Sequence, residues 1–386
     1  MIRLGTFLLA AQFPGRSHAQ ALAGALDCAL ASETAGLDSV WIAEHHFIAY
    51  GTCPSAATFA ANLLGRTRRV QVGTAVSILS THHPVALAEQ TALLDHLSGG
   101  RFHLGVGRGG PWVDLEVFAT GLDRFERGFP ESLDLLLRWL RQPRVAGDGE
   151  RFRFREVAVV PRPRTRPHPP VIVAATTPAT VALAATRGLP VLLGMHQDDH
   201  EKAALLAHYR QVARAHGHDP DSIAPQHAAA ALVHLADSHA AAVAELRAAM
   251  PTWLAHGLGG YVRITPASTP PRDPRAYTEH LLAIHPVGTS EQCAQRLATT
   301  AERTGIGRFL LMVEGVGDHR RAAETIARLG AEVLPLLSGR SDPGSRPCAR
   351  SCSGPPSTAT PRPARTSPAP RAPNTERPST PRTAGG

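Results

Sequence analysis

Three neighbouring side chains that can exchange protons, Glu44, His45 and His46, directly follow a short apolar run over Ser39–Ala43. Imidazole titrates close to neutral pH, so a histidine can accept or return a proton during a reaction. A buried strand needs no polar group at its tip, whereas barrel enzymes carry their catalytic groups where the strands end. The triplet therefore indicates a general acid–base pair or a metal site. A histidine at the end of a strand is about as often structural as catalytic. Because the chain contains 20 histidines, the adjacency of His45 and His46 could also arise by chance.

Polar and small residues also follow other apolar runs. Arg108 lies between Gly107 and Gly109; its guanidinium suits a phosphate group, and the glycines let a ligand approach the backbone closely. Thr176 and Thr177 precede a predicted helix, whose first amides can bind an anion. Taken singly, the arginine is more often a surface ion-pair partner, and a threonine there is usually a helix cap. Together, at one end of the strands, these residues favour a phosphate-bearing cofactor.

The elements that must position these groups alternate between short apolar runs and amphipathic stretches, which is the pattern of parallel strands joined by helices. Strands are expected over Arg3–Ala10, Ser39–Ala43, Val70–Leu79, Phe102–Val106, Val171–Ala174, Val191–Leu193, Ala228–Leu235 and Phe309–Val313. Helices are expected over Ala19–Ala35, Pro54–Leu64, Pro84–Leu97, Glu131–Leu140, Ala179–Thr186, Asp199–Ala215, Ala240–His256 and His319–Leu334. Pro54 and Pro84 suit first helical turns.

This alternation predicts an α/β fold, a TIM barrel with insertions near Arg151–Val160 and between Gly257 and Pro286. An open, doubly wound sheet is the alternative. Its first strand would lead into a G-x-G-x-x-G turn, whereas here the chain continues as QFPGRS. The glycines of GVGRGG near Gly105 have the wrong spacing for that turn.

The end of the chain differs in composition from the rest. From Ser338 to Gly386 it has eleven prolines, eight arginines and two acids, and thus six of the chain's eight net positive charges. Such a segment buries too little apolar surface to offset its ordering entropy, so we expect a disordered tail over 338–386 and a barrel domain over 1–337. The high pI then reflects the tail, and a nucleic-acid partner is not expected.

Five cysteines occur without any CxxC pair, so neither a zinc site nor a disulfide framework is indicated. The apolar start MIRLGTFLLA is interpreted as a first core strand rather than a signal peptide, because polar Gln12 soon interrupts it. No apolar run approaches the roughly 18 residues of a membrane span. We therefore expect a soluble, cytoplasmic protein without a metal site or a membrane partner.

Several blocks resemble one known family, the bacterial luciferase-like, flavin-dependent monooxygenases. They occur in the family's order over Ile2–Leu337 and include FLLAAQ, VWIAEHHF, AANLLG, VGTA, HPVALAEQTALLD, GRFHLGVGRG and HPVGTSEQC. Within the family the chain is most similar to the catalytic α-subunit type. The noncatalytic β-type lacks the paired histidines after the glutamate and the arginine–glycine after the fourth strand, and this chain has both.

The resemblance implies a role for individual residues. His45 matches the catalytic histidine, Glu44 and Phe7 match flavin-lining positions, and Ala75–Val76 matches a non-proline cis peptide under the flavin ring. The flavin phosphate positions correspond to Arg108, Arg127, Thr176 and the amide of Ala179, with Arg127 shifted by one residue in spacing. Asp114 matches an acid that supports binding of reduced flavin. Metal ligands are not implied.

Three departures from the family bear on the substrate. The family's reactive cysteine after the fourth strand is Gly107 here, and its pocket tryptophan after the sixth strand is Met195. A shorter, proline-rich segment, Ile264–Pro274, replaces the long mobile lid. These differences disfavour light emission and a long-chain aldehyde, and favour oxygenation of another small organic molecule.

By resemblance, the cofactor is FMN, delivered in reduced form by a separate flavin reductase, and the co-substrate is O2. A homodimer is expected through a helix carrying Glu89, with His82 and His83 nearby as imidazole partners for that acid; a heterodimer stays open. Two alternatives remain at this point. One is hydride transfer with a deazaflavin, and the other is a noncatalytic flavin-binding subunit.

Overall fold

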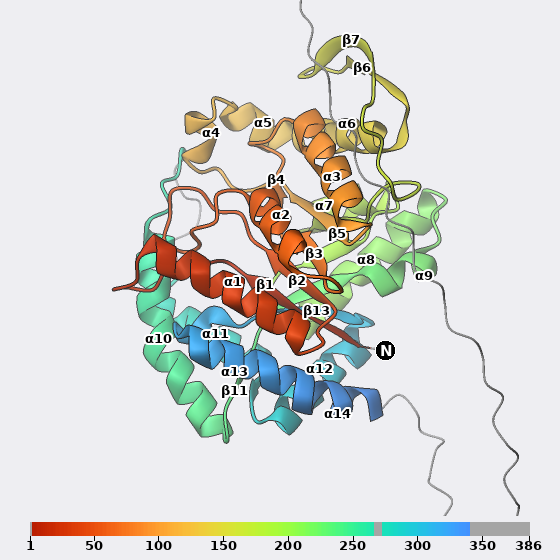
Figure 1. Cartoon of the computed structure of the whole chain (residues 1–386). Coiled ribbons are helices and arrows are strands. Elements are labelled where there is room, and N and C mark those ends of the chain that lie inside the picture. The colour runs from red at the N-terminus through yellow and green to blue at the C-terminus, as the bar shows by residue number, and fades with distance from the viewer. Residues whose placement is uncertain (1, 266–271, 340–386) are drawn as a thin grey trace, which may run out of the picture. The chain divides into compact units, whose positions relative to one another are not determined.

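The computed structural model describes residues 2–265 and 272–339. Its main sheet is parallel and closes on itself, because β3 pairs with both β2 and β5. The barrel strands are β1 (Arg3–Leu8), β2 (Ser39–Ile42), β3 (Gln71–Thr74), β5 (Phe102–Gly107), β8 (Val171–Ala174), β9 (Val191–Leu193), β10 (Ala228–Leu232) and β13 (Arg308–Met312). This closed (β/α) arrangement is a TIM barrel, as predicted, and the open doubly wound alternative is wrong (Figure 1).

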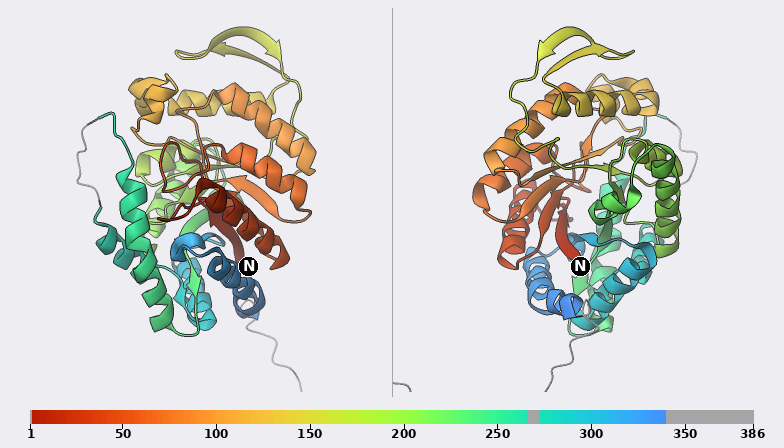
Figure 2. Two further views of the ribbon diagram at one scale, coloured as in Figure 1. Left: turned by 60° about the vertical axis from the view of Figure 1, so that its left-hand side comes forward. Right: turned by 90° about the vertical axis from the view of Figure 1, so that its right-hand side faces the viewer.

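Helices form a layer around the strands (Figure 2). They are α1 (His18–Thr34), α2 (Ala56–Arg66), α3 (Pro84–Ser98), α6 (Phe129–Arg141), α7 (Pro178–Ala185), α8 (Asp199–Ala215), α10 (His239–Gly259), α12 (Ser290–Thr304) and α13 (His319–Arg328). Polar caps begin many of them: Ser17, Asp198 and Thr289 each form a capping box. Because helices cover the sheet outside and side chains fill it inside, most strand residues are buried.

The structure contains further strands and helices besides the barrel strands and the helices around them. The insertion expected near Arg151–Val160 is an antiparallel hairpin, and the one between Gly257 and Pro286 carries a helix. The additional elements are β4 (Ser77–Ile78), α4 (Asp114–Val117), α5 (Gly121–Arg127), β6 (Arg144–Asp148), β7 (Arg153–Ala158), α9 (Pro220–Ile223), η1 (Ala224–Gln226), β11 (His234–Leu235), α11 (Pro274–Ile284), β12 (Val287–Gly288), η2 (Glu314–Val316), η3 (Leu329–Val333) and α14 (Leu334–Ser338).

Two predicted strands are each split in the structure. The run Val70–Leu79 divides into β3 and β4, with a cis peptide bond between Ala75 and Val76 at the break. The run Ala228–Leu235 divides into β10, which belongs to the barrel, and β11, which pairs with β12. Continuous apolar character cannot reveal such a break, because both halves are buried.

The predicted helices need three corrections. Pro54 precedes the first turn of α2, because Ser55 is the N-cap and accepts a hydrogen bond from Thr58 N–H. Helix α13 ends at Arg328, and the chain continues as the π-helix η3 rather than as one helix to Leu334. Helix α12 escaped prediction because its buried face consists largely of small residues such as Cys293 and Ala294.

Two predictions fall largely outside the described residues. The proline-rich segment Ile264–Pro274 includes 266–271, and the tail 338–386 lies beyond the last described residue, Gly339, for nearly its whole length. In the part of the chain that the structure describes, no helix is both long and apolar enough to cross a membrane.

Candidate active site

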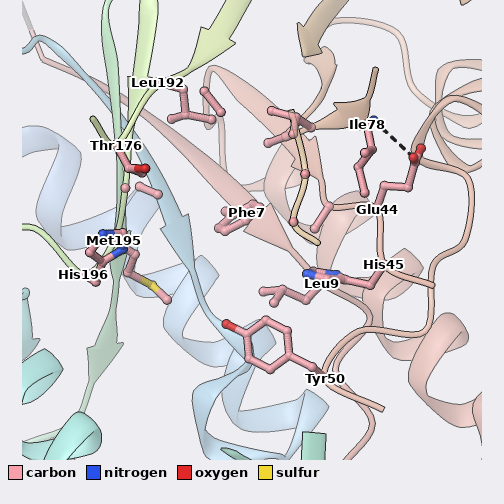
Figure 3. Close-up of a pocket in the computed structure, with 18 of the residues that line it drawn as sticks. Phe7, Leu9, Glu44, His45, Tyr50, Ile78, Thr176, Leu192, Met195 and His196 are labelled. Atoms are coloured by element: carbon pink, nitrogen blue, oxygen red, sulfur yellow. Dashed lines mark hydrogen bonds between the residues drawn. The ribbon is translucent and has the colours of Figure 1, made fainter. Parts of the chain in front are cut away.

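A cavity of about 420 Å³ opens at the carboxyl ends of the barrel strands (Figure 3). This is the end at which TIM barrels carry their chemistry. Ten of the residues singled out from the sequence line the cavity: Phe7, Glu44, His45, His46, Ala75, Val76, Gly109, Asp114, Thr176 and Met195. They lie in or after six different strands, so barrel closure is what brings them together.

His45 is fixed by a hydrogen bond of its backbone and by a contact of its ring. Its N–H donates to Cys53 O over 2.9 Å, and its ring meets Tyr50 edge-on with 5.2 Å between centroids. Among the described residues, its buried Nδ1 has no hydrogen-bond partner. Burial lowers the pKa of His45 to about 4, and the nearby Glu44 only partly offsets this. The imidazole is therefore neutral at physiological pH and retains a lone pair for a proton.

Gly51 allows the ring of His45 to take this position. A Cβ at residue 51 would lie 2.6 Å from His45 Nδ1 and 2.6 Å from Leu9 O. Side-chain carbons essentially never approach this closely, and the backbone oxygen of Leu9 cannot yield easily. A glycine is thus required where the loop after β2 crosses the end of β1.

Glu44 joins three elements in addition to lining the cavity. Its carboxylate accepts hydrogen bonds from Ile78 N–H (3.2 Å) and Ala56 N–H (3.4 Å), and His82 Nε2 lies 2.8 Å away. Burial acts to raise the pKa of Glu44, but the bonds with His46 and His82 and the Ile78 amide outweigh it and lower the pKa to about 2. The side chain is therefore an anion that ties the end of β2 to β4 and to the start of α2.

The cis peptide between Ala75 and Val76 lies in the cavity wall. Gly107, which stands where the family has a cysteine, faces it: a Cβ at residue 107 would lie 2.6 Å from Val76 Cγ2. Any side chain at residue 107 would therefore compete with Val76 for space. The missing cysteine is thus coupled to the position of Val76 in this chain.

Asp114 begins the short helix α4 and is only 4% exposed. Its Oδ1 accepts a hydrogen bond from Leu115 N–H over 3.0 Å. Burial raises the pKa of Asp114 above the ordinary range. A carboxyl group in this position can respond to the charge of a ligand bound in the cavity.

The remaining predicted residues lie outside the cavity lining. The Arg108 guanidinium stacks on Phe125, 4.4 Å from the ring centroid, and the side chain is exposed. Ala179 is exposed in the first turn of α7, whose N-cap is Thr177. Arg127 is also exposed and forms an ion pair with Asp123 within α5. The structure thus brings Arg108 and Ala179 near the cavity through their neighbours Gly109 and Thr176, whereas the side chain of Arg127 is engaged elsewhere.

Sequence reasoning missed several residues of the site. His82, 38 positions after Glu44, is the closest partner of that carboxylate. The cavity lining also includes Trp112, His196, Tyr50, Tyr261 and Tyr277. The rarity of tyrosine could have pointed to Tyr50, Tyr261 and Tyr277, because the whole chain has only four tyrosines. Among the described residues, no group of three or more His, Cys, Asp or Glu side chains is arranged to hold a metal ion.

Curated relatives match this chain over most of its length. An alkanal monooxygenase alpha chain from a Kryptophanaron alfredi symbiont is 28% identical over 362 residues, which cover 88% of this chain and 100% of that one. One from Photorhabdus luminescens is 29% identical over 358 residues, covering 87% and 98%.

Solved structures show the same barrel. Monooxygenase RslO1 from Streptomyces bottropensis has a TM-score of 0.76 at 25% identity and covers 86% of this chain and 99% of that one. The oxygenating constituent of 3,6-diketocamphane monooxygenase from Pseudomonas putida has a TM-score of 0.70 at 19% identity, covering 86% and 98%. The family model described as luciferase-like monooxygenase matches residues 2–308. The chain therefore belongs to the luciferase-like monooxygenase family.

Proposed function

We propose that this protein is a monooxygenase that uses reduced FMN and O2 to oxygenate a small organic molecule. The observation that carries the proposal is His45, a neutral imidazole on the cavity wall whose buried Nδ1 has no partner among the described residues. A buried polar atom without a partner is costly unless a ligand satisfies it. Because His45 also lines the cavity, its imidazole is a proton-handling group next to the space that a bound ligand would occupy.

The residues present fit a flavin. Phe7 and the Ala75–Val76 segment offer apolar walls to a flat ring, and Arg108, Thr176 and the amide of Ala179 offer donors to a phosphate at the start of α7. Asp114 lines the same cavity and would help to hold the flavin, and Arg127 would need to leave Asp123 to take part. Among the structural relatives, the Pseudomonas putida enzyme was solved in complex with FMN, which supports this assignment.

A bound reduced flavin would supply the two electrons needed to place one oxygen atom in the substrate and reduce the other to water. The chain's own residues would bind and orient the flavin and the substrate, and would transfer protons. The neutral imidazole of His45 can accept a proton and return it. Glu44 keeps the ends of β2 and β4 together, so that His45 and Val76 face the same space. Leu9, Leu192 and Met195 give the cavity wall apolar surface.

The two alternatives are separable by experiment. An F420-dependent secondary alcohol dehydrogenase shares the fold, with a TM-score of 0.68 at 18% identity, so a titration of FMN against a deazaflavin distinguishes the cofactors. A noncatalytic role predicts that reduced FMN fails to bind at micromolar concentration. The presence of His45 on the cavity wall supports a catalytic role rather than a noncatalytic one.

The direct test is His45→Ala in the full-length protein. We expect reduced FMN to bind with affinity within about threefold of wild type, while turnover falls by roughly 10²–10⁴-fold, the usual contribution of a general acid or base. Turnover is measured as incorporation of one labelled oxygen atom from ¹⁸O2 into members of a panel of small organic molecules, by product mass.

The matched control is His216→Ala, because His216 is exposed and its ring bonds only to Val212 O of its own helix. Turnover by His45→Ala equal to that of the control would remove His45 from the mechanism. Oxidised product without labelled oxygen would contradict monooxygenation itself.

A further inference from the structure

Three of the four tyrosines in the chain line the one cavity described above: Tyr50, Tyr261 and Tyr277. They come from the loop after β2, the segment after α10, and α11. The fourth, Tyr209, lies in α8 and donates its hydroxyl proton to Leu189 O over 2.8 Å. Residues so rare in the chain that gather from separate segments at one cavity point to a ligand that needs them.

Aromatic stacking holds two of these rings in place. Tyr50 stacks on Trp253 with centroids 4.8 Å apart, and Phe13 also stacks on Trp253, at 5.3 Å. Tyr261 packs on Trp112 with centroids 4.4 Å apart. Figure 3 shows the hydroxyl of Tyr50 pointing into the cavity. Rings fixed in this way present their hydroxyl groups at defined positions before any ligand binds.

The phenols remain hydrogen-bond donors throughout the physiological pH range. Burial, followed by the neighbouring Tyr277 and Tyr261, raises the pKa of Tyr50 far above the ordinary value. Burial also raises the pKa of Tyr261 and of Tyr277. Each hydroxyl therefore keeps its proton and can donate to an oxygen acceptor on a ligand.

Two of the tyrosines come from other elements than the groups assigned to the flavin phosphate. Arg108 follows β5 and Ala179 begins α7, whereas Tyr50 follows β2 and Tyr277 belongs to α11. An unbranched alkyl chain in this part of the cavity would offer no acceptor, so buried donors would be left unpaired. A flat ring system that carries oxygen atoms would both pack against the aromatic walls and accept the hydrogen bonds.

Resting on the proposed function, we infer that the substrate is a planar ring compound that bears hydroxyl or carbonyl oxygens, which Tyr50, Tyr261 and Tyr277 bind through their phenol groups. The same groups disfavour an unbranched aliphatic aldehyde. Tyr277 also borders a second hollow with Arg272, His196 and His280.

Equilibrium dialysis of the full-length protein tests this inference without turnover. The probes are 1,5-dihydroxynaphthalene, naphthalene and decanal, which differ in oxygen placement and shape. We expect the dihydroxy compound to bind at least tenfold more tightly than naphthalene and more tightly than decanal. A triple Tyr50→Phe, Tyr261→Phe, Tyr277→Phe variant should lose about tenfold or more in affinity for the dihydroxy compound and little for naphthalene, since a net hydrogen bond contributes roughly a fewfold to tenfold.

Tyr209→Phe is the matched control and should leave all three affinities unchanged, because Tyr209 lies outside the cavity lining. Equal binding of the dihydroxy compound and naphthalene, tighter binding of decanal, or an unaffected triple variant would overturn the inference. So would competition between oxidised FMN and the dihydroxy compound, because the phenols would then belong to the flavin site. Failure of flavin binding or oxygenation would contradict the proposed function alone, since these binding ratios are measured without either.

Discussion

At the scale of single residues, chemistry in this cavity depends as much on small residues as on polar ones. His45 supplies the imidazole, but Gly51 provides the space that lets its ring lie against Leu9 O. Gly107 does the same for Val76. A methyl group at either glycine would meet an atom at 2.6 Å, so the neighbouring side chain would have to move.

Gly51→Ala should therefore displace His45 from its position. We expect turnover to fall by roughly 10–100-fold, because a shift of about 1 Å at a catalytic group is enough for such a loss, while binding of reduced FMN changes little. Steady-state kinetics and flavin titration check both parts. Gly65→Ala is the control: nothing lies within 4 Å of a Cβ there, and the change should stabilise α2 by up to about 1 kcal/mol. Unchanged kinetics in Gly51→Ala would contradict the prediction, because the loop would then accommodate the methyl group without displacing His45.

At the scale of elements, α3 presents an apolar strip that the single chain leaves uncovered. Leu93 is 50% exposed and Leu97 is 74% exposed, and with Glu89 they recur every four residues along one face. Glu89 is itself exposed, and His82 is bound to Glu44. Of the two imidazoles expected beside Glu89, only His83, the N-cap of α3, therefore remains available to it.

The expected homodimer would cover this strip. Leu97→Arg should then convert the dimer to a monomer at micromolar concentration, because an interface cannot bury an unpaired guanidinium without a large cost. Sedimentation equilibrium measures the change. Leu336→Arg provides the control, since Leu336 is 39% exposed on α14, away from α3. A wild-type protein that sediments as a monomer would contradict the homodimer.

At the scale of the whole molecule, buried histidines link stability to pH. Burial lowers the pKa of His103 to about 3, of His227 to about 4 and of His285 to about 3. In the unfolded chain these side chains bind protons as the pH falls below about 6.5, whereas in the folded state they do not until about pH 4. Stability is therefore lost as the pH falls through this window. Glu314 opposes them, because burial raises its pKa to about 7 and the folded state then binds one extra proton.

The free energy of unfolding should consequently fall on acidification from pH 6 to pH 5, by about 3–4 kcal/mol if these three histidines and His45 act against one glutamate at ~1.4 kcal/mol per proton and pH unit. Urea denaturation at the two pH values measures it. His227→Gln should make this pH dependence shallower by about one proton, because glutamine can still accept the hydrogen bond from Val191 N–H. His216→Gln, at an exposed site, should leave the slope unchanged. A flat profile would mean that the buried histidines are protonated in the folded state.

Much of the barrel was predictable because its strands are locally recognisable. Val171–Ala174 and Val191–Leu193 have the predicted bounds, since short apolar runs between polar turns allow little choice. The split of Val70–Leu79 and helix α12 were not predictable in this way. Backbone breaks inside a buried run, and helices buried through small side chains, carry no distinct periodic signal.

The sequence by itself determined which residues could do chemistry, since Glu44 and His45 end a strand, and strand ends in a barrel meet at one face. Only the tertiary structure decided the partners. It paired Glu44 with His82, left Nδ1 of His45 without a partner among the described residues, and gathered Tyr50, Tyr261 and Tyr277 around the same cavity. The physical reason is that hydrogen bonding, desolvation and shape depend on contacts between segments distant in the chain, which local patterns do not encode.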